Sequence, residues 1–315
     1  MLKLKAMIHK KLVIVLVNYH GFKDTKACVE SIRLHSEKHA FIIIVDNSEP
    51  SDTSLEEIMD DNMHLIQTGE NFGFGKANNL GINWVREHVH FDSLLLLNND
   101  TLITAGSLQT MQTCLKKQNA GIVTCKTMFV DDPTLVWYGG GEVDYKKGWP
   151  KIVDFNQQAS AEGADKSRYV TFVSGCVILF SRDAIEQLEG FDEIFFMYAE
   201  DLELSIRAAK KNVKIWYTSE ATIYHKVQGS FGDKNKYKGM HSKNRALDFH
   251  FYHKKRNQWI TFRKHLEGKA FRTFRRNYWF SFYKTLFRIL LRSPQRFKVL
   301  RAAFKVMRSL SYKEK

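Results

Sequence analysis

The sequence predicts an α/β fold: a mostly parallel sheet with helices on both faces, followed by a basic, mainly helical C-terminal region. Three observations support this prediction. Short β-rich runs alternate with helix-like segments, several of these runs are apolar throughout, and positive charge is concentrated near the C-terminus. Runs that are apolar throughout are typical of strands in sheets covered on both faces, as in α/β proteins.

The alternation can be followed along the first hundred residues. Buried strands are predicted at 11–17 and 41–47, separated by an amphipathic helix at 25–37. A helical turn (SLEEIMDD), a short strand (MHLIQTG) and a helix at 75–88 come next. FDSLLLLNND supplies a fourth strand, which completes a β-α-β-α order.

The second half continues the pattern with fewer elements. Residues 170–188 read as a strand that leads into a helix, and another helix opens near Glu200. KIWYTSEATIYHKVQGSFG then predicts two short strands and a turn.

Composition narrows the class of protein. Hydrophobic residues make up 44% of the 315 residues, which indicates a globular chain. The 4 Cys form no CxxC pair, so no zinc knuckle is recognisable and a reducing compartment is expected. The apolar run at 12–17 is too short for a signal peptide, and no window reaches the roughly 18 apolar residues that span a bilayer. We therefore expect a cytoplasmic protein.

Charge divides the chain into two parts. Of the 48 Lys and Arg residues, 21 follow residue 242, together with only 3 of the 34 acidic residues. Such asymmetry indicates parts with different partners. We expect a catalytic domain at 1–242 and a basic, aromatic helical region at 243–315.

Polar residues stand where the four predicted strands end, at Asn18, Asp46-Asn47, Glu70-Asn71 and Asn98-Asn99-Asp100. In open parallel sheets, ligands bind beyond these carboxyl ends. Asp100 suits a divalent cation that carries a diphosphate, or it caps a helix at 103–113. Asp46 suits a nucleotide's ring N–H or sugar hydroxyls, or it forms an Asx turn.

Three further features are candidate sites. The loop at 70–81 contains Gly73 and a helix start at Lys76, whose backbone N–H groups are suited to an anion. Asn78 stands where a dinucleotide fingerprint needs its third glycine, which argues against a hydride-transfer enzyme. Glu200 and Asp201 stand at the start of a predicted helix and form a candidate site. The alternative is that these two acids only interact favourably with the helix dipole, as acids in a first turn commonly do. His225 is the last residue of a predicted strand. It is either a ligand or a structural histidine.

Seven stretches carry a resemblance to a known family: VNYHG, IIIVDNS, ENFGFGKANN, LLLLNNDT, SGCVILFSRDAI, GFDEIFFMYAEDLELSIRA and YHKVQGS. In this order they resemble the family 2 glycosyltransferases with the GT-A fold, and within them the bacterial rhamnosyltransferase-like branch. The resemblance runs from about Val13 to Phe231.

The resemblance implies a role for each polar group. Asp100, at the family's D-x-D position, would bind Mn²⁺ or Mg²⁺, and His225 would be a further metal ligand. Asp201 would be the general base, with Glu200 beside it near the acceptor. The remaining residues would form the nucleotide-sugar pocket: Asn18, Asp46, Asn47, Asn71, Gly73, Lys76, Asn78, Asn98 and Asn99. The first D-x-D position is Asn98 here, which leaves one anionic ligand.

The implied activity is a metal-dependent, inverting sugar transfer. One base suffices for direct displacement, whereas glycosidases use paired carboxylates without a nucleotide pocket. The branch suggests L-rhamnose from dTDP-L-rhamnose, with a UDP- or GDP-hexose as the alternative donor. The acceptor would be a hydroxyl of a lipid-linked saccharide in cell-surface polysaccharide synthesis, such as cell wall, O-antigen or capsule.

The basic region favours a membrane surface as its partner. After Pro294, apolar residues that include Phe297, Phe304 and Val306 fall on one side of a helix and cations on the other. We expect peripheral binding to the inner face of the plasma membrane, through its anionic lipids. Alternatively, residues 249–293 pack on the catalytic domain. The interleaved basic and aromatic residues also permit nucleic-acid binding, but no nucleic-acid motif is present, so no nucleic acid is expected as a partner.

Overall fold

The computed structural model describes residues 8–35, 40–160, 163–227, 247–292 and 296–311. The strands are β1 (Ile8–Asn18), β2 (Phe41–Asp46), β3 (Met63–Gln67), β4 (Val89–Asn98), β5 (Thr101–Ile103), β6 (Ile122–Phe129), β7 (Val136–Tyr138), β8 (Gly141–Asp144), β9 (Trp149–Ile152), β10 (Arg168–Val170), β11 (Val177–Ser181) and β12 (Ile215–His225). The helices are α1 (Phe22–His35), the 3₁₀ turn η1 (Thr53–Ile58), α2 (Phe74–His88), α3 (Ser107–Lys117), α4 (Arg182–Leu188), α5 (Glu200–Lys210), α6 (Leu247–His265), α7 (Gly268–Arg292) and α8 (Arg296–Ser311).

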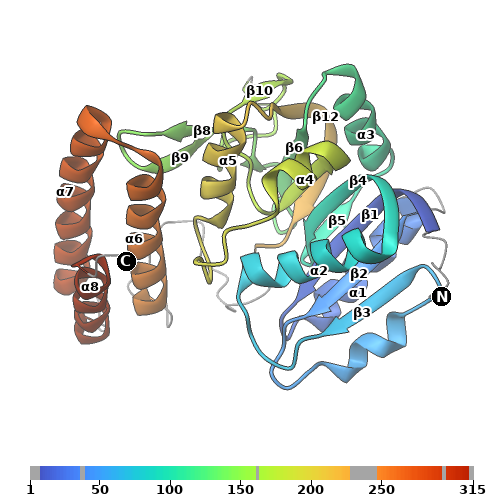
Figure 1. Cartoon of the computed structure of the whole chain (residues 1–315), viewed down its shortest axis with the longest axis horizontal. Helices are drawn as coiled ribbons and strands as arrows, with labels where there is room; N and C mark the ends of the chain where they lie inside the picture. The colour runs from blue at the N-terminus through green and yellow to red at the C-terminus, as the bar shows by residue number, and fades with distance from the viewer. Residues whose placement is uncertain (1–7, 36–39, 161–162, 228–246, 293–295, 312–315) are drawn as a thin grey trace, which may run out of the picture.

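One large mixed sheet organises the molecule, in the order β10-β12-β6-β11-β4-β1-β2-β3 (Figure 1). Strands β3, β2, β1 and β4 run parallel, and the pairing of Asn18 with Asp46 puts the ends of β1 and β2 side by side. Strand β11 is antiparallel to β4 and β6, while β12 is parallel to β6. The prediction of an α/β fold with a mostly parallel sheet is confirmed.

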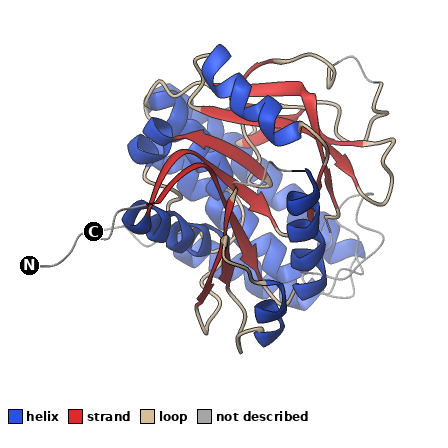
Figure 2. Cartoon of the chain, turned by 90° about the vertical axis from the view of Figure 1, so that its right-hand side faces the viewer, coloured by secondary structure: helices blue, strands red, loops and turns tan. Residues whose placement is uncertain are grey.

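Both faces of the sheet are covered, because alternate residues of a strand point to opposite sides. On β1, Val13 and Val15 pack in the apolar cluster that contains residues of α2, α4 and α5. Leu12, Ile14 and Leu16 pack in the cluster with α1 and α3. Figure 2 shows the twisted sheet between these helices.

The C-terminal region is a group of three helices that lies beside the sheet, at the left of Figure 1. Phe251 and Phe262 of α6, and Phe274 of α7, are fully or almost fully buried and belong to the same apolar cluster as α5. Helix α6 therefore packs against α5 of the α/β part of the chain. The expected domain boundary at 242/243 lies outside the described residues.

Helix α8 differs from the expected interfacial helix. Val299, Ala303 and Val306 are fully buried in the protein's own core, whereas Phe297 and Phe304 are exposed beside the cations. Part of its apolar side is thus used for packing against neighbouring helices. None of the helices in the described part of the chain combines the length and apolar content that crossing a lipid bilayer requires.

Candidate active site

The end of β4 meets the end of β12 through the short strand β5. Thr101 of β5 pairs with His225 of β12, and this register brings the His225 Nε2 atom to 3.0 Å from Asp100 Oδ1, with both side chains largely buried. The two residues expected to bind metal therefore lie in contact. The alternative that Asp100 caps a helix at 103–113 is wrong, because α3 begins at Ser107 after the cap residue Gly106.

This pair fits a divalent cation. Asn98 Oδ1 and His225 Nδ1 are buried without a hydrogen-bond partner in the described part of the chain, and Asn98 Nδ2 lies 3.4 Å from His225 Nε2. The residues described form no group of three or more His, Cys, Asp and Glu side chains around a metal position. One carboxylate, one imidazole and one amide oxygen match a cation that takes its other ligands from a diphosphate and water.

Asp46 is fully buried and engaged in the protein's own loop. Its carboxylate accepts hydrogen bonds from Asn18 Nδ2 at 3.0 Å and from the backbone N–H groups of Ser48 and Asp52. The bond from Ser48 is the Asx turn weighed from the sequence. In this structure Asp46 therefore shapes the end of β2, and the expected contact with a base requires this loop to open.

A chain of hydrogen bonds joins residues expected to bind the nucleotide to the strand end that carries the expected metal ligand Asp100. Asn99 Nδ2 donates to Thr25 Oγ1, and that hydroxyl donates to Asn18 Oδ1, both at 2.8 Å. Asn18 is fully buried and also accepts from the N–H of Gly21. The ends of β1, β2 and β4 are thus tied together, although Thr25 was not among the expected site residues.

The loop before α2 is held by side-chain amides. Asn47 Nδ2 donates to Asn71 Oδ1 at 2.9 Å, while Asn47 Oδ1 accepts from Phe72 N–H. Asn71 Oδ1 also accepts from Gly73 N–H. The backbone N–H groups of Phe72 and Gly73 are therefore already bonded to side chains of the protein, although the N–H groups of this loop were expected to suit an anion.

The start of α2 packs against the chain that precedes α5. Phe74 N–H donates to Phe196 O, and a Cβ on Gly73, whose φ is +79°, would lie 2.1 Å from that oxygen. Only glycine fits such an approach. Lys76 Nζ lies over the Phe72 ring at 4.0 Å, and Asn78 Nδ2 donates to Phe74 O within its own helix.

Glu200 and Asp201 begin α5, as expected. Burial, and then the neighbouring Asp201, raise the pKa of Glu200 well above its usual value, and Glu200 Oε2 has no partner among the described residues. Burial also raises the pKa of Asp201, although hydrogen bonds from Gly175 and Leu202 N–H groups oppose this. A buried carboxyl with a raised pKa is a candidate for proton transfer.

The segment 174–176 connects the two halves of the site. Gly175 N–H donates to Asp201 Oδ2 at 3.1 Å, and the next residue, Cys176, accepts a backbone hydrogen bond from Asn98 N–H at 2.9 Å. The strand end next to Asp100 and the helix start that carries Asp201 are therefore both hydrogen-bonded to the adjacent residues Gly175 and Cys176. The arrangement brings the candidate metal ligands and the candidate base to one segment of backbone.

Several contacts that support this site were not foreseen. Glu203 is fully buried and accepts hydrogen bonds from Arg207 of α5 and His265 of α6. Asn257 of α6 donates to the carbonyl oxygens of Met197 and Tyr198, just before the acidic pair. The α6 partners in these contacts, Asn257 and His265, stood out in the sequence only as polar residues within an aromatic, basic stretch.

Comparisons with known proteins agree with the resemblance seen in the sequence. A sequence model of the family described as glycosyltransferase like family 2 matches residues 9–261. The chain is 25% identical over 217 residues to the low-salt glycan biosynthesis hexosyltransferase Agl10 of Haloferax volcanii, a match that covers 68% of this chain and 66% of that relative, slightly less than two thirds of its length.

A mycobacterial protein and one solved structure complete the comparison. The chain is 24% identical over 251 residues to N-acetylglucosaminyl-diphospho-decaprenol L-rhamnosyltransferase of Mycobacterium tuberculosis, covering 74% of this chain and 81% of that protein. The crystal structure of GalNAc-T7 with UDP, GalNAc and Mn²⁺ superposes with a TM-score of 0.57 at 14% identity, covering 90% of this chain and 58% of that one. That likeness establishes the GT-A fold.

Proposed function

This chain belongs to the glycosyltransferase-like family 2, which it matches over residues 9–261, and we propose on that premise that it is an inverting, metal-dependent hexosyltransferase. The donor is a nucleotide diphosphate sugar, dTDP-L-rhamnose first and a UDP- or GDP-hexose as the alternative. The acceptor is a hydroxyl of a saccharide on a lipid diphosphate, the kind of substrate named for the mycobacterial relative. Such a reaction belongs to cell-surface polysaccharide synthesis.

The observation that carries this proposal is the placement of Asp100 with His225 and of Asp201 around residues 174–176. The acceptor oxygen attacks the anomeric carbon of the donor sugar while the bond from that carbon to the diphosphate oxygen breaks. Asp201 takes the acceptor's proton, and the nucleoside diphosphate leaves with the bonding electron pair. One displacement inverts the configuration.

The other residues of the site position the base, the metal ion and the nucleotide. Gly175 and Leu202 N–H groups hold the two oxygens of Asp201, and each oxygen keeps a further acceptor position for the substrate hydroxyl. Asp100, His225 and Asn98 would hold Mn²⁺ or Mg²⁺, which supplies positive charge to the leaving diphosphate when it is bound. Hydrogen bonds of Asn18, Asn47 and Asn71 hold the strand ends and the loop that would surround the nucleotide.

The basic C-terminal region supports a place at the inner face of the plasma membrane. Lys298, Arg301 and Lys305 are exposed on α8, and each cation close to an anionic leaflet contributes about 1 kcal/mol of binding free energy. A peripheral position would bring the enzyme to its lipid-linked acceptor.

A panel of nucleotide sugars tests the function directly. The purified full chain is heated with each donor, with and without Mn²⁺, and then assayed for transfer to N-acetylglucosaminyl-diphospho-prenol. A donor at 100 times its Kd stabilises the fold by about 2.7 kcal/mol, and we expect this with dTDP-L-rhamnose only when Mn²⁺ is present. A chain that no nucleotide sugar stabilises, and that transfers none of them, contradicts the proposal.

A further inference from the structure

A cavity of about 630 Å³ lies between α6, α7 and the β8–β9 hairpin, outside the candidate active site. None of the described residues that line it is acidic. Five of them are Lys or Arg side chains: Lys147, Lys254, Lys255, Lys284 and Arg288. Lys147 Nζ lies 3.5 Å from Asp144 Oδ2 on the same hairpin, but the described lining itself contributes cations and no carboxylate. Such a concave surface favours an anionic ligand.

The hairpin wall of this cavity is built by specific contacts. Gln258 of α6 donates to Lys147 O, and Asn277 of α7 donates to Lys146 O. Gly148, with a φ of +69°, approaches α7 so closely that a Cβ would lie 2.3 Å from the Phe274 ring. The two helices therefore hold the hairpin's tip at this position.

Two of the cations are partly buried among neutral groups. Lys255 Nζ donates to Ser281 Oγ at 3.1 Å, and Lys254 Nζ lies 4.9 Å from the centre of the Tyr198 ring. Burial lowers the pKa of both lysines, that of Lys255 to about 8. A buried ammonium without a carboxylate beside it is costly, and a bound anion would remove that cost.

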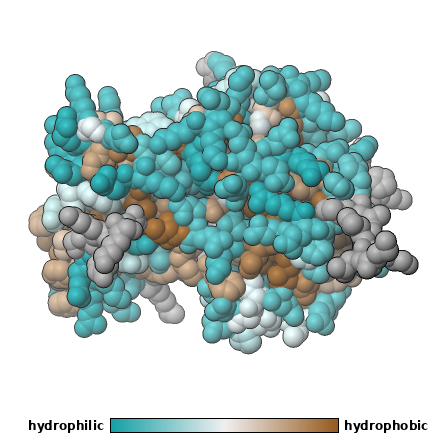
Figure 3. Space-filling view, viewed as in Figure 1, coloured by the Kyte–Doolittle hydropathy of each residue, from teal (hydrophilic) through white to brown (hydrophobic). Residues whose placement is uncertain are grey.

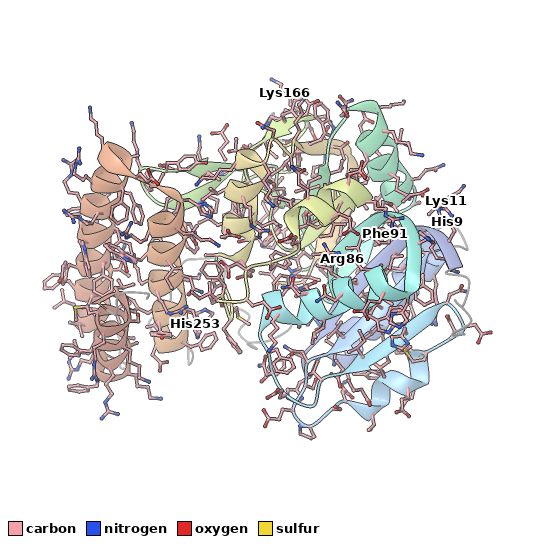
Figure 4. The ribbon with its side chains drawn as sticks, viewed as in Figure 1. His9, Lys11, Arg86, Phe91, Lys166 and His253 are labelled. Atoms are coloured by element: carbon pink, nitrogen blue, oxygen red, sulfur yellow. The ribbon has the colours of Figure 1, made fainter. Side chains whose placement is uncertain are left out.

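One residue of the cavity contacts the segment that precedes the acidic pair. His250, which lines it, lies with its Nδ1 2.6 Å from the Tyr198 hydroxyl. Tyr198 stands two residues before Glu200, at the start of α5. On the same helix, His253 faces the catalytic domain, where its ring lies 5.6 Å from that of Phe196 (Figure 4). The cavity is thus linked through His250 and Tyr198 to the start of α5, which carries Asp201.

An exposed apolar stripe begins at the cavity. Phe280, Tyr283, Phe287 and Leu291 recur every three or four residues of α7, so they share one face of the helix, and all four are exposed. Phe280 also lines the cavity. Figure 3 shows hydrophobic residues on the surface at the left, where α7 and α8 lie. Cations next to exposed apolar side chains suit a molecule with an anionic head and a hydrocarbon tail.

We propose that this cavity binds the diphosphate of the lipid-linked acceptor, with the lipid along the α7 stripe and the sugar directed towards Asp201. This inference rests on the proposed function. It identifies α6, α7 and the β8–β9 hairpin as the acceptor site, apart from the nucleotide side of the sheet.

Binding of farnesyl diphosphate to the full chain without donor tests the inference. The double variant Lys284→Gln/Arg288→Gln removes two exposed cations of the cavity, and Lys116→Gln/Lys117→Gln removes two exposed cations of α3 as the matched control. By calorimetry, we expect the cavity variant to bind at least tenfold more weakly and the control to bind as the parent does. Equal binding by all three proteins overturns the inference.

Two further arms separate the source of the phosphate. Inorganic diphosphate should compete with farnesyl diphosphate, because the shared group occupies the cavity. If the cavity variant loses only its binding to phosphatidylglycerol vesicles and keeps its affinity for farnesyl diphosphate, the cations serve lipid headgroups and the inference is wrong.

Transfer kinetics separate this inference from the proposed function. We expect the cavity variant to show a higher KM for the lipid-linked acceptor and an unchanged KM for the donor. An unchanged acceptor KM in an active enzyme overturns the acceptor site alone. A chain that uses no sugar donor contradicts the function, while the weaker binding of farnesyl diphosphate would still identify the anion site.

Discussion

Gly175 donates its backbone N–H to Asp201 Oδ2 at 3.1 Å, and the adjacent Cys176 carbonyl oxygen accepts the N–H of Asn98 at 2.9 Å. Residues 175 and 176 therefore hold the candidate base and the candidate metal-binding strand end at a fixed separation. Direct displacement needs two such groups in fixed places, because the acceptor and the leaving diphosphate lie on opposite sides of the anomeric carbon.

Replacement of Asp201 by Asn tests its role as the base. The amide keeps the shape of the side chain but takes no proton, so we expect kcat to fall by about 10²–10⁴-fold. Nucleotide binding should stay nearly unchanged, since Asp201 is assigned to the acceptor. Stopped-time assays and calorimetric titration with the nucleotide measure the two effects. Asp183→Asn, at an exposed position on α4, is the control, and undiminished turnover in Asp201→Asn rules out this base.

The pH dependence of transfer follows from the burial of the acidic pair. Burial raises the pKa of Asp201 above the ordinary aspartate value of 3.8, and a general base works only when it is ionised. Activity should therefore fall as pH decreases through the raised pKa, at a higher pH than for an ordinary aspartate. A profile of kcat/KM from pH 4 to 9 measures this limb. A limb at the ordinary aspartate pKa would mean that Asp201 is not the titrating group.

The contact between Asp100 and His225 predicts a defined metal dependence. Asp100→Asn removes the charged oxygen ligand, so the Mn²⁺ concentration for half-maximal activity should rise on the order of tenfold or more. Titration of the apoprotein with Mn²⁺, followed by electron paramagnetic resonance, measures binding without turnover. Asp60→Asn, far along the sequence from this pair and bonded to Arg33, is the matched control. Identical Mn²⁺ affinity in both variants would place the metal elsewhere.

The strands of the parallel half were predictable because their sequences are apolar throughout. LVIVLV, FIIIVD and LLLLN form the buried centres of β1, β2 and β4. The contact between Asp100 and His225 was expected from the family resemblance alone, since 125 positions separate them and only strand pairing unites them. The closure of Asp46 into its own loop was one of two open alternatives, because an Asx turn and a ligand contact use the same oxygen atoms.

Local patterns did not reveal the rest. Strands β6 to β9 are short or carry mixed polarity, and β12 is one strand with a register shift where two strands were expected. The basic C-terminal sequence favoured a membrane surface as partner and left open whether residues 249–293 pack on the rest of the protein. In the structure, hydrogen bonds to the loop before α5 and to α5 itself help to hold α6 in place. Asn257 with Tyr198, and His265 with Glu203, form these hydrogen bonds.

The pairing of Glu203 with α6 predicts a large effect on stability. Burial alone would raise the pKa of Glu203, but hydrogen bonds from His265 and Arg207 lower it from 4.5 to about 2. Glu203→Gln leaves these partners without their counter-charge, so we expect a loss of about 3–5 kcal/mol in the free energy of unfolding. A folded-state pKa below the unfolded value stabilises the protein above pH 4.5, and this contribution is lost as pH falls towards 2. Urea unfolding at pH 7 and pH 3 should therefore show a smaller difference between parent and variant at pH 3.

The control for this prediction is Glu87→Gln, at an exposed position on α2, which should have the same stability as the parent at both pH values. Equal stability of Glu203→Gln and the parent at pH 7 would show that this buried pair does not hold α6 to α5.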